Sequence, residues 1–123
     1  MSSPRHSTPG LRLRIVFPGG AWIGPGKADL LAGIAETGSI LKAGQRMGMG
    51  YKRAWGLVEA LNTMFAAPLI ATTRGGASGG GASLTETGAQ VLHHYRKAEA
   101  AAARAAADPV AALLGLTVIS GKK

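Results

Sequence analysis

Cysteine is absent from this sequence, and acidic and aromatic residues are few. Without cysteine the chain can form no disulfide and no thiolate metal site, which fits a reducing cytoplasm. Aromatic residues make up only 5%, so aliphatic residues and alanine must fill most of a core. Six Asp and Glu oppose fourteen Lys and Arg, for a formal net charge of +8 on 123 residues. An excess of that size favours a polyanionic partner, above all double-stranded DNA.

Targeting and membrane segments are not visible either. Residues 1–10, MSSPRHSTPG, contain no apolar stretch, so we expect a flexible arm and not a signal peptide. No apolar run approaches the roughly 18 residues of a membrane-spanning helix. The length predicts one domain over residues 11–108, followed by a tail at 109–123 that the pattern does not place. We expect a cytoplasmic protein associated with the nucleoid.

The N-terminal half predicts two strands and three helices. Residues 11–17, LRLRIVF, alternate cations with apolar side chains, which predicts a strand with Arg12 and Arg14 on one face. A turn follows, and WIG returns as a short second strand. Apolar residues at helical spacing then predict three helices, of which Gly38 ends the first and Ser39 caps the second. Their expected ranges are 27–37, 39–48 and 51–65.

The C-terminal half predicts a hairpin and one long helix. LIATT at 69–73 is β-branched and short, which is typical of a strand. Residues 74–83 hold five glycines in ten positions and predict a hairpin tip. Thr85 is a suitable N-cap for a helix that we expect to run until Pro109. The fold class expected is therefore α+β, a winged helix-turn-helix with a long C-terminal dimerisation helix.

The second and third predicted helices have the spacing of a helix-turn-helix. Gly44 stands where two crossing helices would touch, and Gly48 stands at the bend four residues later. Met49 would fill the crevice between the helices, and Ala54 would pack underneath. A plain αα-hairpin without a binding function has the same spacing, so this alternative stays open.

Cations at the start of the third helix suggest a DNA contact. In helix-turn-helix proteins the N-terminal residues of the second helix meet base edges in the major groove. Here those residues are Gly50, Tyr51, Lys52 and Arg53. Arginine can bond guanine bidentately, and lysine supplies a point charge for guanine or phosphate. Trp55 either packs the helix against the body, which we prefer, or contacts a base.

Further DNA contacts are expected on both sides of this helix. Ser39 would contact a phosphate through its hydroxyl or through the free N–H groups at the helix start, although it could equally serve as a cap alone. Lys42 and Arg46 point outward and are either phosphate contacts or solvated surface residues. In the expected wing we assign contacts to Arg74, Gly79 and Gly80.

The sequence pattern does not support a phosphate loop, a metal site or an enzyme. Ala21 stands where a phosphate loop needs its first glycine, and Ala28 stands where it needs Ser or Thr. The adjacent His93 and His94 would point about 100° apart on a helix, so they cannot chelate one metal ion. The acids are scattered and form no general acid–base pair or catalytic triad. We expect no enzyme, no metal and no cofactor.

A family resemblance adds to this interpretation. ETGSILKAGQRMGMGYKRAWGLVEALNTMFAAPLI followed by GGASGGGASLTETGAQVLHHYRKAE resembles the N-terminal DNA-binding domain of the molybdate-responsive regulator ModE, which is similar to the LysR-type winged helix. The resemblance covers roughly residues 11–104. It implies a homodimeric transcriptional regulator of molybdate-uptake or molybdoenzyme genes, with residues 11–17, 27–37 and 85–107 near the two-fold axis.

The sequence departs from the family pattern at three places. Gly50 replaces the usual serine, and the wing lysine is missing from GGASGGG. No oxyanion-binding domain follows before Lys123, so we expect a regulator without its own molybdate sensor, or one whose partner supplies the signal. Two alternatives remain: an interaction module that heterodimerises with a full-length regulator, and a non-specific nucleoid-type DNA binder.

Overall fold

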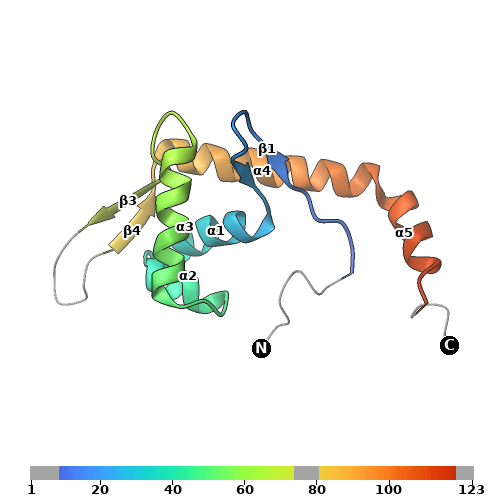
Figure 1. Ribbon diagram of the computed structural model, residues 1–123, viewed down its shortest axis with the longest axis horizontal. Coiled ribbons are helices and arrows are strands. Elements are labelled where there is room, and N and C mark those ends of the chain that lie inside the picture. The colour runs from blue at the N-terminus through green and yellow to red at the C-terminus, as the bar shows by residue number, and fades with distance from the viewer. Residues whose placement is uncertain (1–8, 74–80, 119–123) are drawn as a thin grey trace.

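The computed structural model describes residues 9–73 and 81–118. Five helices and two small antiparallel sheets follow one another along these residues (Figure 1). Their order is β1 (Ile15–Val16), β2 (Trp22–Ile23), α1 (Pro25–Thr37), α2 (Ile40–Arg46), α3 (Tyr51–Met64), β3 (Ile70–Thr73), β4 (Gly81–Leu84), α4 (Glu86–Ala105) and α5 (Ala107–Gly115). The expected α+β composition is therefore observed. Within the described ranges, no helix is long and apolar enough to cross a membrane.

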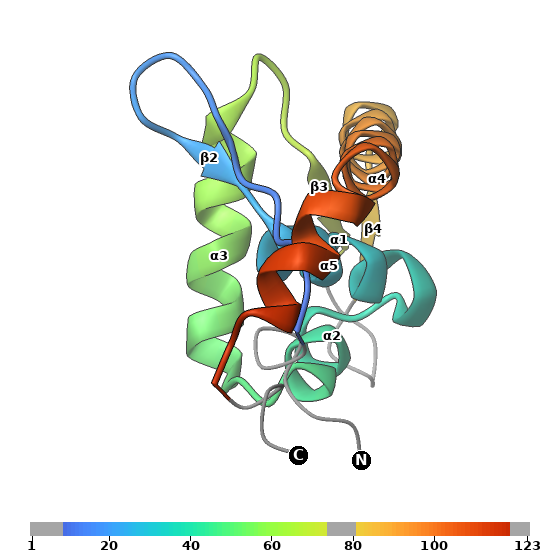
Figure 2. The same cartoon turned by 90° about the vertical axis from the view of Figure 1, so that its right-hand side faces the viewer.

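Helix α1 forms the centre of the core. Four of its side chains are fully buried, namely Ala28, Leu30, Leu31 and Ile34. Around it pack α2, α3, α4 and strand β4, and α5 projects from the far end of α4 (Figures 1 and 2). The remaining core side chains come from these elements: Ile23, Ile40, Ala43, Ala54, Val58, Leu61, Leu69, Ile70, Ala82 and Tyr95. Aliphatic residues and alanine thus make up nearly all of the core, as the composition predicts.

The helix ends occur where local sequence signals predict them. Gly38 ends α1 in the left-handed conformation, at φ 72°, and its N–H donates to the carbonyl of Ile34. Ser39 then caps α2, since its hydroxyl accepts from the N–H of Lys42 at 3.0 Å. Gly48 makes the bend before α3 at φ 70°. The turn that separates α2 from α3 is therefore determined by residues within a short stretch of chain.

The contact between α2 and α3 depends on a missing side chain. A Cβ atom at Gly44 would lie 3.0 Å from the Cβ of Ala54 and 3.4 Å from the Cγ of Met49. The distance to Ala54 is tighter than ordinary van der Waals contact, and the distance to Met49 is at its lower limit. The predicted close approach of these two helices is confirmed.

The β3–β4 hairpin is attached to the helices by polar contacts. Asn62 of α3 accepts through its Oδ1 from the N–H groups of Leu69 and Ile70, both at 2.9 Å, and donates through its Nδ2 to the carbonyl of Ile70 at 3.1 Å. On the other strand, the N–H of Ala82 donates to the carbonyl of Gly38 at 2.9 Å. The hairpin is thereby held between α3 and the junction of α1 with α2.

The first predicted strand is longer than the strand that the structure shows. The strand expected over 11–17 is only Ile15–Val16. Its partner β2 has just two residues, because Pro25 already begins α1, so the residues before Ile15 find no strand to pair with. The arm at 1–8 and the hairpin tip at 74–80 lie outside the described residues.

The long C-terminal helix is also not continuous to Pro109. Helix α4 ends at Ala105, and Ala106 leaves the helical conformation at φ −95° and ψ 5°. A proline cannot sit in a helix interior, because it lacks an N–H and its ring collides with the preceding turn. Pro109 instead occupies the first turn of α5, where no intrahelical N–H bond is needed. The boundary placed at residue 108 therefore falls inside a helix.

Candidate functional site

The start of α3 and the outer face of α2 carry a group of exposed cations. We define the α2–α3 cationic surface by Lys42, Arg46, Lys52 and Arg53, all four of which are exposed. Tyr51 lies beside them with 51% of its surface exposed. Helix α2 and the start of α3 lie at the lower edge of the view in Figure 1, away from the β1–β2 strands and α5. The structure therefore brings these predicted site residues together on one surface.

Helix α3 has an apolar face that sets the direction of these cations. Ala54, Val58 and Leu61 are buried along one stripe, as the sequence predicts. Trp55 is half-buried, packs against the core, and lies edge-to-face with Tyr51 at 6.2 Å between ring centroids. This supports the packing role for Trp55 over a base contact. Because the stripe faces inward, the first turn of α3 points its cations to solvent.

No side chain caps the N-terminus of α3. Gly50 is the N-cap, with φ −73° and ψ 163°, and it has no side chain to accept a hydrogen bond. The first N–H groups of a helix have no partner within the helix, and the helix dipole is positive at this end. An anionic oxygen is the natural partner for such groups. Gly50 thus leaves the start of α3 open to an anion.

On α2 and at its N-cap, Arg46 and Ser39 have side-chain contacts within the chain. Arg46 forms an ion pair with Glu36 of α1, with 2.5 Å between Nη1 and Oε1. Both side chains are at least half exposed, so the pair contributes little to stability. Glu36 stands ten positions before Arg46 on another helix, so the spacing of residues in the sequence does not predict this pair. The hydroxyl of Ser39 serves the α2 cap in this structure, and Lys42 is exposed.

The wing contacts expected from the sequence lie outside the described residues. These are Arg74, Gly79 and Gly80. The base of the hairpin is described, and there the hydroxyl of Thr73 accepts from the N–H of Gly81 at 3.0 Å. The register pairs Thr73 with Gly81, so the strands lie antiparallel up to the last described residues.

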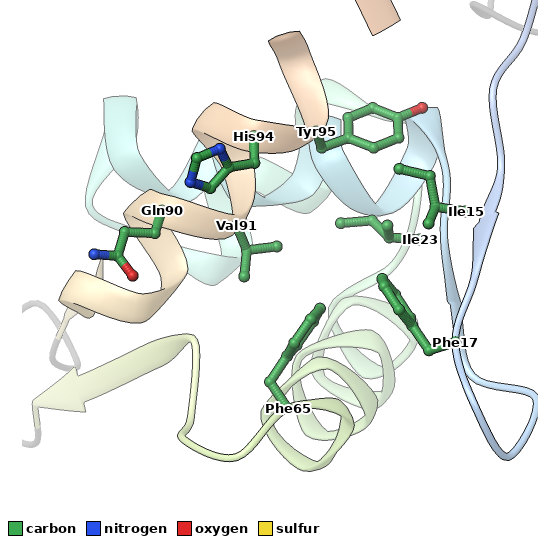
Figure 3. Close-up of a pocket in the computed structure, with 8 residues that line it drawn as sticks. All are labelled: Ile15, Phe17, Ile23, Phe65, Gln90, Val91, His94 and Tyr95. Carbon is green, nitrogen blue, oxygen red and sulfur yellow. The ribbon is translucent and has the colours of Figure 1, made fainter. Parts of the chain in front are cut away.

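A second feature, which the sequence analysis missed, is an apolar groove of about 280 Å³. Side chains from β1, β2, the end of α3 and the N-terminal half of α4 line it (Figure 3). The lining residues are Ile15, Phe17, Ile23, Phe65, Gln90, Val91, His94 and Tyr95. Phe17 and Phe65 meet edge-to-face at 5.2 Å, and the hydroxyl of Tyr95 donates to the carbonyl of Leu13. Among the described residues no lysine or arginine lines the groove, so this lining is unsuited to a small oxyanion.

One further cationic cluster surrounds Trp22 in β2. The Lys27 Nζ lies 3.4 Å from the centre of the indole ring, and the Arg14 guanidinium lies 4.0 Å from it. Burial lowers the pKa of Lys27, and the charge of Arg14 lowers it further. The same ammonium group donates to the carbonyl of Trp22 at 3.1 Å. These contacts fasten the start of α1 to β2.

Metal ligands are not assembled in residues 9–73 and 81–118. No group of three His, Cys, Asp or Glu side chains there could hold a metal ion. His93 and His94 are both exposed on α4, with their ring centroids 5.3 Å apart. In this part of the chain the α2–α3 cationic surface is thus the arrangement best suited to an anionic partner.

Several proteins similar to this chain carry names connected with molybdenum. Over 73 residues the chain is 38% identical to the molybdenum-pterin-binding protein MopB of Rhodobacter capsulatus, which covers 59% of the chain and 27% of MopB. It is 40% identical over 63 residues to the molybdenum transport protein ModE of Herbaspirillum seropedicae, which covers 51% of the chain and 23% of that protein. With the transcriptional regulator ModE of Haemophilus influenzae it shares 33% identity over 71 residues, or 58% of the chain and 28% of the relative. No family model matches the chain.

The matched stretch spans about a quarter of the length of these relatives. The comparisons also correct the family resemblance drawn from the sequence. That resemblance was to the N-terminal DNA-binding domain of ModE, carried by YKRAW and the glycine-rich loop. MopB, and also MopA of Rhodobacter capsulatus, to which the chain is 36% identical over 70 residues, are named for molybdenum-pterin binding. These matches do not support an N-terminal helix-turn-helix.

Two conclusions drawn from that resemblance change with it. The label of a winged helix-turn-helix with a long dimerisation helix is not retained, and the fold is described by its α+β elements alone. The expectation of a regulator without a molybdate sensor loses its support, because it was an inference from ModE domain order. DNA binding therefore has no support from the comparisons, and only the geometry of the surface bears on it.

Proposed function

We propose that the chain acts in molybdenum-dependent regulation and contacts double-stranded DNA through the α2–α3 cationic surface. The names of MopB and of the molybdenum transport protein ModE support the link to molybdenum, and the name of the transcriptional regulator ModE supports the link to regulation. The observation that carries the DNA contact is the open first turn of α3, which presents Lys52 and Arg53 beside uncapped N–H groups. A net charge of +8 supports the same kind of partner.

The shape of this surface suits the major groove of DNA. The groove is wide enough for one helix, and a helix that enters it by its N-terminal turn places its first side chains against base edges. Arg53 then has the fork of donors that matches guanine, and Lys52 has a point charge for phosphate. The backbone N–H groups at Gly50 and beyond meet a phosphate oxygen.

A selection experiment followed by titration tests this proposal. Genomic DNA fragments bound by the purified chain at about physiological salt supply the preferred sequence. Arg53→Ala is expected to weaken binding to that sequence by about 1–3 kcal/mol and to relax the preference at one base position. Arg104→Ala removes the same charge from the exposed far end of α4 and serves as the matched control.

Each other result of this titration has a defined meaning. Equal losses for Arg53→Ala on all sequences would indicate non-specific, nucleoid-type binding. Equal losses for Arg53→Ala and Arg104→Ala would show that only net charge matters. Absence of binding to any fragment would overturn the DNA proposal.

A second candidate function is direct binding of a molybdenum oxyanion. The names of MopB and MopA favour it, since both are called molybdenum-pterin-binding proteins. Calorimetric titration with molybdate tests it, with sulfate as a control of the same charge. Saturable heat with molybdate but not with sulfate would make this chain a sensor, and a flat titration would remove this candidate.

The remaining expectations stay predictions that follow from the proposal. A DNA contact of this kind predicts a cytoplasmic protein on the nucleoid, and a homodimer that reads two half-sites. Pairing with a longer regulator that carries the oxyanion site predicts a heteromeric complex, which co-purification of mixed chains detects. The absence of enzymatic activity also stays a prediction.

A further inference from the structure

Tyr51 is a large aromatic side chain at the exposed start of α3. It is the first residue of the helix, with 51% of its surface exposed, and it directly precedes the exposed Lys52 and Arg53. Its ring differs in chemistry from both neighbours, because it offers apolar atoms and no positive charge. The first turn of α3 therefore presents an apolar ring as well as two cations.

Trp55 holds the ring of Tyr51 in place. The two residues are four positions apart on α3, so they lie on the same face of the helix. Their rings meet edge-to-face, with centroids 6.2 Å apart and planes inclined at 79°. Trp55 is half-buried and packs against the core, so it gives the ring of Tyr51 a fixed support. Tyrosine has only two side-chain torsions, and a supported ring loses little conformational entropy when it makes a contact.

Tyr51 and Arg53 point to different sides of the helix start. A helix turns by about 100° for each residue, so these two side chains lie on either side of Lys52. The buried stripe of α3 occupies the opposite face and holds the helix to the core. A helix that enters the major groove with its first turn thus brings Tyr51 and Arg53 against different bases.

The major groove offers one apolar group to a ring in this position. Base edges there are donors and acceptors of hydrogen bonds, except for the 5-methyl group of thymine. Lys52 and Arg53 match phosphate and guanine, but neither cation gains from a methyl group. An aromatic ring does gain, because packing against the methyl group removes apolar surface of both from water. Thymine is therefore the base that suits Tyr51.

We infer that Tyr51 is a base-reading residue whose ring packs against the 5-methyl group of a thymine. This inference rests on the proposed DNA contact through the α2–α3 cationic surface, and it adds a second base to the guanine that suits Arg53. The two residues then specify two positions of the DNA site independently, one through an apolar contact and the other through hydrogen bonds.

Replacement of thymine by uracil provides the first test, because uracil keeps the base pair and lacks only the methyl group. The DNA is the preferred sequence selected from genomic fragments, made as synthetic duplexes in which each thymine in turn is replaced by uracil. At the position that Tyr51 reads, uracil is expected to weaken binding about fourfold, which corresponds to the burial of one methyl-sized group. Uracil at the other thymines is expected to leave binding unchanged.

Variants of the chain assign this effect to Tyr51. Tyr51→Ala is expected to bind the thymine and uracil duplexes equally, and it keeps the fold because Tyr51 is exposed and lies outside the core. Tyr51→Phe keeps the ring without the hydroxyl group and is expected to retain the preference for thymine. Arg53→Ala is the matched control, since it weakens binding overall but is expected to keep the same preference.

The outcomes separate this inference from the proposed function. If the wild-type chain binds no DNA, the proposed function fails and this inference fails with it. If the chain binds DNA but no uracil replacement weakens binding, or if the selected sequence contains no thymine, the DNA contact stands and this inference is overturned. A preference for thymine that survives in Tyr51→Ala, or that Tyr51→Phe loses, also overturns it, since another side chain or the tyrosine hydroxyl would then read the base.

Discussion

Gly88, in the first turn of α4, lies so close to Leu69 that a Cβ atom at Gly88 would collide with the carbonyl oxygen of Leu69. The same carbonyl accepts from the N–H of Thr85 at 2.9 Å, so it cannot easily move aside. The backbone before β3 and the start of α4 are thus in direct contact, which only glycine permits.

Gly88→Ala is therefore expected to lower the free energy of unfolding by about 1–3 kcal/mol, as overpacking does. Gly56→Ala is the control, because Gly56 lies inside α3 and a Cβ there would have no described atom within 4 Å apart from its chain neighbours and the backbone of its own helix. Alanine at that position is expected to raise the free energy of unfolding by about 0.5–1 kcal/mol. Urea denaturation measures both values, and a stabilised Gly88→Ala variant would contradict the close contact.

Asn62 provides a second stability prediction. Its side chain makes three hydrogen bonds to the backbone at Leu69 and Ile70, and both of these residues are buried. Asn62→Ala leaves these backbone groups without partners and is expected to cost about 1–3 kcal/mol in urea denaturation. Asn62→Asp keeps the two hydrogen bonds that the side chain accepts. Its free energy of unfolding is therefore expected to lie between those of the wild type and Asn62→Ala. An alanine variant as stable as wild type would show that solvent replaces the side chain.

Ser39 separates the capping role from a DNA contact. Its hydroxyl accepts from the N–H of Lys42, so Ser39→Ala is expected to cost about 1 kcal/mol of stability. Ser39→Asp retains a cap but adds a negative charge at the DNA surface. We expect Ser39→Asp to be near wild type in urea denaturation and weaker in DNA binding. If Ser39→Asp bound DNA as tightly as the wild type, the start of α2 would not contact a DNA phosphate.

The salt dependence of DNA binding tests the role of Lys52. When the logarithm of the DNA binding constant is plotted against the logarithm of the salt concentration, the line falls with a slope set by the number of phosphates that cations neutralise. Each such phosphate contributes about 0.9 to the size of this slope. Lys52→Ala is expected to reduce this slope by roughly that amount. Arg46→Ala is expected to reduce it less, because Arg46 is already paired with Glu36. A slope that Lys52→Ala leaves unchanged would exclude Lys52 from the phosphate contacts.

The pKa of Lys27 tests the cation cluster at Trp22. Burial and then Arg14 lower this pKa from its ordinary value of 10.5. The protonated form is thus disfavoured in the folded chain. Its unfavourable effect on stability is fully present below the folded pKa and disappears as pH rises through that value toward 10.5. The free energy of unfolding should therefore rise slightly with pH in this window.

Nuclear magnetic resonance titration of the lysine side chains measures this pKa directly. Lys27 is expected to titrate below the ordinary lysine value of 10.5, and Arg14→Ala is expected to move the pKa of Lys27 part of the way back. A pKa of Lys27 at 10.5 would show that the ammonium group leaves the indole ring in solution.

Motif resemblance proved a weaker guide than local pattern. The stretch YKRAW correctly predicted exposed cations at the start of α3 and an inward Trp55. The same stretch led to an assignment to the N-terminal domain of ModE, which the matches to MopB and MopA overturn. A short motif reports the local environment of its residues, whereas a domain assignment depends on the whole matched segment.

The sequence by itself determined the features that depend on neighbouring residues. The left-handed Gly38, the cap at Ser39, the bend at Gly48 and the buried stripe of α3 all follow from steric limits and hydrogen bonds within a few positions of the chain. Such signals act in the same way in any fold. For this reason the helix boundaries in the first half of the chain were predicted to within a few residues.

Only the tertiary structure decided the features that join distant segments. The pair of Arg46 with Glu36, the contact of Gly88 with Leu69 and the groove shared by four elements each require the packing of the whole chain. The two-residue length of β1 also depended on a partner, since a strand forms only where another strand can accept its hydrogen bonds. These distances cannot be predicted from local sequence patterns, because they arise only when the other elements pack around the buried side chains of α1.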